Sequence, residues 1–332
     1  MRGNRLALGA TVFGLLLAGC GGGGETAATV APAGPPQEVP VTLDGYANPQ
    51  NLGILMAEER LFFRDAGLSL FLAPPAAPQR PVPYVVNGTD ELGVAHLPQV
   101  VAARATGHPV VVVGSLVSQP TTAMIWLRRS GIGSVADLKG KTIATPGVPG
   151  QEELLRAMLA RAGLTPADAK VIDVGYDLVP ALLDGRADAI FGGSENIEGA
   201  ELESRGAKPV LTTPQELGAP DYEELVVIAR ADTVAADPAL PRRFMAAVER
   251  GTALAINDPR EALYAIEESA WGKVETARGV TRAQVEATLP LLSRSGRVDP
   301  QRAQELIDWM QEEGLIPARI DASKLIADSP PA

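Results

Sequence analysis

The sequence predicts an α/β protein with two lobes, each a mainly parallel sheet flanked by helices, and a helical C-terminal segment. Strand and helix patterns alternate along residues 39–230, which is typical of layered α/β proteins. The 332 residues are many for one hydrophobic core, so two lobes of ordinary size are expected. The stretch "EELVVIAR" reads as a strand that returns the chain to the first lobe.

The first 38 residues are predicted to lie outside these lobes. Arg2 and Arg5 come before an apolar stretch of about a dozen residues, which is shorter than the roughly 20 that span a bilayer. Residues 1–19 therefore read as a lipoprotein signal peptide, followed by Cys20, the only cysteine. The alternative is an unmodified cysteine after an ordinary secretory signal. Residues 20–38, rich in Gly, Ala and Pro, predict a flexible tether.

The first lobe is expected to comprise residues 39–118 and 225–332. Strands are predicted at 39–46, 68–73 and 109–117 and at the end of 84–96, and helices at 51–67 and 97–107. The run 109–117 is apolar throughout, as in a strand buried on both faces. From residue 232 onward the pattern is helical. Helix caps are expected at Asp237-Pro238, Asp258-Pro259, Asp299-Pro300 and Thr281 with Gln284.

The second lobe is expected to span residues 119–224. Strands are predicted at 122–129, 142–146, 169–175, 187–193 and 207–213. Helices are predicted at 134–141, where Ser134 and Asp137 form a capping pair, and at 151–163, 177–185 and 195–206. The chain would thus cross between the lobes twice, and such a hinged pair can close on a ligand.

Composition excludes several classes of function. The net charge is −11 and no Lys/Arg cluster occurs, which argues against a nucleic-acid partner and against anionic lipid. With one cysteine, no disulfide can form within the chain. There are two histidines and no metal-ligand spacing, phosphate loop or nucleophile motif, so we expect no metal, no cofactor and no enzyme activity. A monomer is expected.

Three stretches carry a resemblance to a known family. They are "ADLKGKTIATPGVPGQEELLRAML", "VGYDLVPALLDGRADAIFGG" and "ENIEGAELESRGAKPV". From about Leu43 to Ala318 the chain resembles solute-binding lipoproteins of ABC importers that serve nitrate, sulfonates, taurine and the pyrimidine precursor of thiamine. The resemblance implies a two-lobed type II periplasmic-binding-protein fold, with a membrane permease and an ATPase as partners. "LVPALLDGRADAI" followed by "EGAELE" is most similar to the thiamine-precursor branch. Cys20 resembles the acylated cysteine of a lipobox, so an extracytoplasmic location with a lipid anchor is expected.

In the first lobe, candidate ligand-binding residues follow the predicted strands, because pockets lie at strand ends and between domains. The alternatives to ligand contact are an Asx cap at residues 48–51, a structural role for His96 and support of the hinge by Gln119. The family pattern often has an acidic residue and a histidine where Gln50 and Asn51 stand. The candidates in this lobe are Tyr46, Asn48, Gln50, Asn51, His96 and Gln99, and Gln119 is a further candidate at the predicted hinge, where the second lobe begins.

The second lobe supplies the remaining candidates. Exposed amides at the start of helix 151–163 could bind an anion, but Glu152 and Glu153 already complement the helix dipole and would repel full negative charge. Tryptophans that the precursor branch carries near Ser194 and Ile197 are absent, whereas Glu198 could accept from a ligand amine. The candidates are Gly147, Gly150, Gln151, Tyr176, Ser194, Asn196, Glu198 and Tyr222.

These observations predict a lipid-anchored protein that delivers a small polar ligand, in the manner of a thiamine-pyrimidine precursor, to an ABC importer. One alternative is a tethered sensor without transport. Another is a binding protein for a small anion such as a sulfonate. A synthase of the thiamine pyrimidine shares this fold, but it needs a cysteine-rich motif that Cys20 alone cannot supply.

Overall fold

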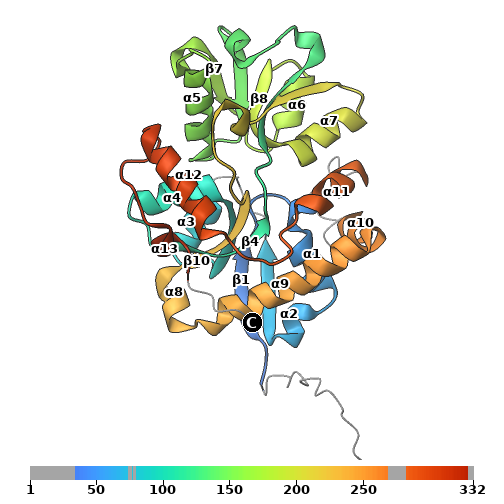
Figure 1. Ribbon diagram of the computed structural model, residues 1–332. Helices are drawn as coiled ribbons and strands as arrows, with labels where there is room; N and C mark the ends of the chain where they lie inside the picture. Colours follow the sequence, from blue (N-terminus) through green and yellow to red (C-terminus); the bar gives the residue numbers. More distant parts are fainter. Residues whose placement is uncertain (1–33, 74–76, 78–79, 268–281, 328–332) are drawn as a thin grey trace, which may run out of the picture. The chain divides into compact units, whose positions relative to one another are not determined.

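Five strands form the first of two mixed sheets. The computed structural model describes residues 34–73, 77, 80–267 and 282–327 (Figure 1). The strand order in this first sheet is β2-β1-β3-β10-β4. Its strands are β1 (Gln37–Thr42), β2 (Leu68–Ala73), β3 (Leu92–His96), β4 (Val110–Val117) and β10 (Leu225–Arg230).

The second sheet is built from one continuous part of the chain. Its order is β7-β6-β8-β5-β9. Its strands are β5 (Thr122–Leu127), β6 (Thr142–Thr145), β7 (Lys170–Asp173), β8 (Ala189–Ser194) and β9 (Pro209–Thr212). Residues 118–121, the first crossing, lead the chain into this sheet, and residues 213–224, the second crossing, lead it back.

Both sheets are mixed because the chain enters β5 and β10 directly from the other sheet. β1 pairs in parallel with β2 and β3, and β6 pairs in parallel with β7 and β8. β10 runs antiparallel to β3 and β4, and β5 runs antiparallel to β8 and β9. The predicted α/β class is confirmed. Parallel pairing is confined to strands joined by helical crossovers, as parallel strands require.

Helices accompany each sheet. The helices that come before the second sheet in sequence are α1 (Leu52–Glu59), α2 (Phe62–Asp65), α3 (Pro81–Val86) and α4 (Leu97–Ala105), and the 3₁₀ turn η1 (Pro49–Asn51) precedes α1. The helices that come after it are α8 (Ala231–Ala236), α9 (Ala239–Asn257), α10 (Pro259–Glu267), α11 (Arg282–Thr288), α12 (Pro300–Glu312) and α13 (Ala322–Leu325), and the 3₁₀ turn η8 (Leu289–Leu291) follows α11. The helices between or directly after the strands of the second sheet are α5 (Gln151–Arg161), α6 (Leu178–Leu183) and α7 (Ala200–Ser204). The shorter turns in this part of the chain are η2 (Arg128–Ser130), η3 (Val135–Leu138), η4 (Pro166–Asp168), η5 (Glu195–Gly199) and η6 (Gln215–Leu217). α9 packs alongside α1 and α2 (Figure 1).

Apolar side chains cover both faces of the central strands. All eight residues of β4 are buried, as the continuous apolar run predicted. Val111 and Val113 pack in the cluster with α1 and α9, while Val110 and Val112 pack in the cluster with α3, α4 and α12. This alternation follows from the period of two along a strand. The predicted stripe of α12 is likewise buried, at Leu306, Ile307 and Met310.

Some predicted boundaries were wrong. The single helix expected over residues 51–67 is two helices, α1 and α2, because Leu61 adopts the left-handed conformation with φ 60°. A left-handed residue interrupts the intrahelical hydrogen bonds, and Leu61 is 55% exposed, so packing does not oppose the break. The tether was expected to reach residue 38, but β1 begins at Gln37, which pairs with Leu68 of β2.

Helix caps in the C-terminal part agree with the sequence. Asp237 accepts from the backbone of Leu240, Asp258 accepts from the backbone of Arg260, and Asp299 caps α12. Ser134 and Asp137 form the predicted capping box of η3. Thr281, like Cys20 and residues 1–33, lies outside the described residues. Within the described part of the chain, no helix has both the length and the apolar character needed to cross a membrane.

Candidate functional site

A cavity lies where strand ends of both sheets meet. Its wall combines residues that follow β1 and β3 with residues that follow β6, β7 and β8. Carboxyl ends of strands are where ligands bind in open α/β sheets. The lining residues are Asp44, Gly45, Tyr46, Asn48, Gln50, His96, Pro146, Val148, Gln151, Gly175, Tyr176, Leu178, Gly192, Ser194, Ile197 and Glu198.

Two tyrosine rings from opposite sheets meet at this cavity. Tyr46 comes shortly after β1, and Tyr176 lies between β7 and α6. Their centroids are 6.0 Å apart and their planes are inclined by 75°, an edge-to-face contact. Tyr176 is 39% exposed, so part of its ring remains accessible beside the cavity. The pair offers apolar surface for a flat ligand.

Among the described residues, two carboxyl groups line the cavity and no lysine or arginine does. Asp44 Oδ1 accepts a hydrogen bond of 2.9 Å from Asn51 Nδ2. Glu198 Oε2 accepts one of 2.7 Å from the backbone nitrogen of Ser194. Burial raises the pKa of both carboxyl groups, that of Glu198 to about 7. Partly desolvated carboxylates favour a ligand that brings N–H donors or positive charge.

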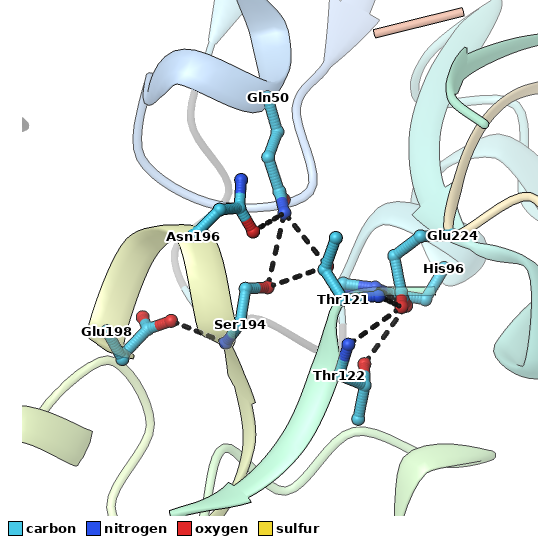
Figure 2. Close-up of polar contacts among 8 residues, drawn as sticks. All are labelled: Gln50, His96, Thr121, Thr122, Ser194, Asn196, Glu198 and Glu224. Carbon is cyan, nitrogen blue, oxygen red and sulfur yellow. Dashed lines mark hydrogen bonds and ion pairs between the residues drawn. The ribbon is translucent and has the colours of Figure 1, made fainter. Parts of the chain in front are cut away.

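Gln50 joins the two sheets across this site (Figure 2). Its Nε2 lies 3.1 Å from Thr121 Oγ1, 3.2 Å from Ser194 Oγ and 3.1 Å from Asn196 Oδ1. Ser194 ends β8 and Asn196 belongs to η5, a π-helical turn of a kind often found at functional sites. One amide on η1 therefore holds the first crossing and the end of β8 together.

His96 is held by a buried carboxylate. Its Nδ1 lies 2.9 Å from Glu224 Oε1, and Glu224 is fully buried. Burial lowers the pKa of His96, but the hydrogen bond and charge of Glu224, with the charges of Asp44 and Glu198, outweigh burial and raise the pKa above 6.5. The positive charge of a protonated His96 is thus opposed by the carboxyl groups of Glu224, Asp44 and Glu198.

Gln151 presents an amide to the cavity from the start of α5. It is 2% exposed, and among the described residues its Nε2 and Oε1 have no hydrogen-bond partner. Gly192 in β8 makes room for it, because a Cβ there would lie 2.8 Å from Gln151 Oε1. An amide carries both donor and acceptor atoms, so Gln151 can bond to a matching pair on a ligand.

The structure brings part of the predicted set to the cavity. The predicted residues that line it are Tyr46, Asn48, Gln50, His96, Gln151, Tyr176, Ser194 and Glu198. Asn48 has a second role, because its side chain and that of Asn51 form the capping box that opens η1. The Asx-cap alternative therefore holds for Asn48 alongside its place in the lining.

The other predicted residues lie around the cavity without lining it. Gln119 is exposed in the first crossing, and Tyr222 is fully buried in the cluster with α4 and α12. Gly147 packs against the side chain of Asp173, and Gly150 packs against the backbone of Gln99. The residues outside the lining are Asn51, Gln99, Gln119, Gly147, Gly150, Asn196 and Tyr222.

Sequence reasoning missed Asp44 and Glu224. Asp44 fell inside the predicted strand 39–46, but β1 ends at Thr42, so Asp44 begins the loop that forms the cavity. At the second crossing the predicted residue was Tyr222. Of the glutamates that follow it, Glu223 and Glu224, the one whose carboxylate bonds His96 is Glu224. Alternation along the strand that follows could have indicated which of the two glutamates faces inward.

Comparison with solved structures identifies the fold. The fold is that of periplasmic solute-binding proteins. The alkanesulfonate-binding protein SsuA of Xanthomonas axonopodis pv. citri, bound to MOPS, superimposes with a TM-score of 0.69 at 19% identity, over 89% of this chain and 99% of that one.

Sequence similarity identifies the family. Residues 48–262 match the NMT1/THI5-like family, and the chain belongs to this family. A thiamine biosynthesis protein of Haemophilus influenzae is 31% identical over 85% of this chain and 88% of its own length. The formylaminopyrimidine-binding protein of Halalkalibacterium halodurans is 32% identical over 68% of this chain and 69% of its own length.

The family also includes enzymes. A 4-amino-5-hydroxymethyl-2-methylpyrimidine phosphate synthase of Legionella pneumophila is 30% identical over 68% of this chain and 71% of its own length. Relatives thus comprise both a binding protein and synthases, and the names of both contain an aminopyrimidine.

Proposed function

We propose that this protein is an extracytoplasmic solute-binding protein that binds an amine-bearing pyrimidine and delivers it to an ABC permease and its ATPase. The observation that carries this proposal is the charge of the cavity: Asp44 and Glu198 line it, and no lysine or arginine does. A relative of similar length named for formylaminopyrimidine binding supports the same ligand class.

The chemistry of a 4-aminopyrimidine matches the groups on the wall. Its exocyclic amine donates N–H bonds that a carboxylate such as Glu198 accepts. The adjacent ring nitrogen and amine form an acceptor and donor pair, which is complementary to the amide of Gln151. Tyr46 and Tyr176 offer aromatic surface against which a flat ring can pack. The carboxylates of the cavity would repel a sulfonate or nitrate, and so would Glu152 and Glu153 at the start of α5.

Closure of two lobes would couple binding to delivery. In this proposal the two sheets with their helices are the lobes, and residues 118–121 and 213–224 are the hinge. A ligand that contacts residues of both sheets stabilises the arrangement in which they meet, which is a shift of population. The permease would then recognise that arrangement.

The test is a titration of the wild-type chain Gly21–Ala332, unfolded and refolded to remove bound solute. The ligands are formylaminopyrimidine, 4-amino-5-hydroxymethyl-2-methylpyrimidine, taurine, an alkanesulfonate and nitrate. We expect a thermal shift with the pyrimidines, since a ligand at 100 times its Kd adds about 2.7 kcal/mol of stability. A shift with the anions alone would contradict the proposal.

The same samples separate binding from synthesis. After incubation the bound solute is released with denaturant and weighed by mass spectrometry. A binding protein returns the pyrimidine at its original mass. A changed mass would show that the chain transforms the pyrimidine, and it would contradict the assignment as a binding protein.

We also propose a lipid anchor on Cys20, which lies outside the described residues. The motif Leu17-Ala18-Gly19-Cys20 carries this part of the proposal. In cells that export the full chain, Cys20→Ser should move the protein from the membrane fraction to the soluble fraction. Cys20→Ser protein that still sediments with membranes would contradict the anchor.

A further inference from the structure

Glu224 occupies an unusual position, at the end of the second crossing and directly before β10. Its carboxyl group is fully buried and accepts four hydrogen bonds (Figure 2). Oε2 lies 2.6 Å from the backbone nitrogen of Thr121 and 2.9 Å from that of Thr122. Oε1 lies 2.9 Å from His96 Nδ1 and 3.0 Å from Thr122 Oγ1. The acceptor positions of a carboxylate number about four, so all are used.

These contacts keep the carboxyl group ionised inside the protein. Burial raises the pKa of Glu224, but the hydrogen bond and charge of His96 and the amides of Thr121 and Thr122 outweigh burial, so the pKa is lowered. A buried charge without such partners would be strongly destabilising. The donors are therefore part of what keeps this segment in place.

The four partners come from three parts of the chain that meet at the hinge. Thr121 ends the first crossing, and Thr122 begins β5 of the second sheet. His96 ends β3 of the first sheet and lines the cavity. Glu224 itself belongs to the second crossing. One side chain thus connects both crossings to a residue of the cavity wall.

The contact also fixes how His96 meets a ligand. A neutral imidazole carries its proton on one nitrogen, and the partner of the other nitrogen decides which. With Glu224 accepting at Nδ1, the proton is held at Nδ1, and Nε2 is the nitrogen left to bond a ligand. Nε2 then accepts when the ring is neutral and donates when the ring is protonated.

We propose that Glu224 is a positioning residue that couples the ligand cavity to the hinge. Through Oε1 it sets the orientation and proton position of His96, and through Oε2 it clamps the backbone where the first crossing enters β5. A ligand bonded to His96 therefore stabilises the same hydrogen bonds that hold the crossings together. This inference rests on the proposed function only in requiring that a ligand enters the cavity.

Other ionisable groups, on the elements that surround the His96–Glu224 pair, interact with its charges. Asp44, in the loop after β1, and Glu198, in η5, raise the pKa of His96. The charge of Glu224 also raises the pKa of Glu195 on η5 and of Tyr222 in the second crossing, although burial is the larger cause for both. Any pH profile of His96 contains the contributions of Asp44 and Glu198, so the test compares variants that leave Asp44 and Glu198 in place.

The test uses Glu224→Gln with Glu223→Gln as its matched control. Glu223 is the neighbouring buried carboxylate, but it bonds Arg302 and the backbone of Asp299 and touches neither His96 nor Thr121. We expect Glu224→Gln to weaken formylaminopyrimidine binding at least tenfold in calorimetry, and Glu223→Gln to change it less than twofold. Equal losses in the two variants would overturn the proposal.

Two measurements without ligand test the same residue directly. The chain has only two histidines, so ¹⁵N NMR of the wild type resolves the tautomer of His96. We expect the proton at Nδ1, and in Glu224→Gln a lower pKa for His96 together with at least tenfold faster amide exchange at Thr121 and Thr122. A proton at Nε2 in the wild type would overturn the proposal even where Glu224→Gln fails to fold.

These arms separate the two proposals. If no pyrimidine binds the wild type, the ligand assignment fails, while the tautomer and exchange results still decide the role of Glu224. If pyrimidine binds but His96 titrates identically in wild type and Glu224→Gln, the ligand assignment stands and the coupling is overturned.

Discussion

Replacing Gly150 by alanine should weaken formylaminopyrimidine binding by about 5- to 150-fold, because overpacking costs roughly 1–3 kcal/mol. Gly150 directly precedes α5, a helix that packs on the second sheet, and adopts φ +87°. A Cβ at this position would lie 2.7 Å from both the Cα and the nitrogen of Gln99, and 2.8 Å from the carbonyl carbon of Pro98. Those atoms are backbone at the start of α4, so a rotamer change cannot remove the clash.

The clash arises only where the loop before α5 touches α4. Alanine would therefore destabilise the arrangement in which the two sheets approach each other, and with it the ligand-bound state. The measurement is the calorimetric Kd, with small-angle scattering of the ligand-free and ligand-bound forms to follow closure.

Gly163→Ala is the matched control at the other end of α5. Gly163 also has a left-handed φ, +75°, but a Cβ there would have no heavy atom within 4 Å. Both variants suffer the backbone strain of a non-glycine residue at positive φ, about 1–2 kcal/mol of stability. We expect only Gly150→Ala to lose affinity. Equal affinities would mean that the contact with α4 has no part in binding.

Glu198→Gln should weaken binding of an amine-bearing pyrimidine by about 10- to 150-fold, since a hydrogen bond to a charged group contributes roughly 1.5–3 kcal/mol. The glutamine oxygen can still accept from the backbone of Ser194, so the turn η5 should keep its shape. Glu195→Gln is the control, because Glu195 lies on the same turn but is exposed and does not line the cavity.

The pKa of Glu198 predicts a release of protons on ligand binding, which a purely steric role of Glu198 would not cause. Burial raises this pKa to about 7, above the ordinary 4.5. The ligand-free fold therefore holds the proton more tightly than the unfolded chain does, and the stability from this group is lost as the pH rises from about 4.5 through 7. Ligand N–H bonds favour the ionised form, so binding at pH 7 should release protons.

Calorimetry in buffers of different ionisation enthalpy measures that release. We expect wild type and Glu195→Gln to release protons on binding formylaminopyrimidine, and Glu198→Gln to release fewer. Identical proton release in Glu198→Gln and wild type would remove Glu198 from the ligand contacts.

Much of the fold could be predicted because it follows from short-range patterns. β2 matches its predicted bounds, residues 68–73, and β4 was found from its unbroken apolar run. The break at Leu61 could not be predicted, because leucine favours a helix and the neighbouring residues contain no Gly or Pro that would signal a break. The antiparallel direction of β10 depends on the path of the whole chain, which no local pattern encodes.

The site was predictable in position more than in detail. Strand ends pointed to Gln50, His96 and Glu198, which line the cavity. The role of Glu224 escaped because it depends on contacts with residues 103 and 128 positions away, Thr121 and His96. Such pairings are set by tertiary structure, and a single sequence carries no record of them.

The order of strands in the first sheet also bears on how the chain folds. β10 lies between β3 and β4, so this sheet stays incomplete until residues 225–230 have been made. All strands of the second sheet come from residues 122–212, so its contacts close shorter loops and are available earlier during synthesis. The second sheet can therefore form before the first sheet is complete, and β10 then completes the first sheet.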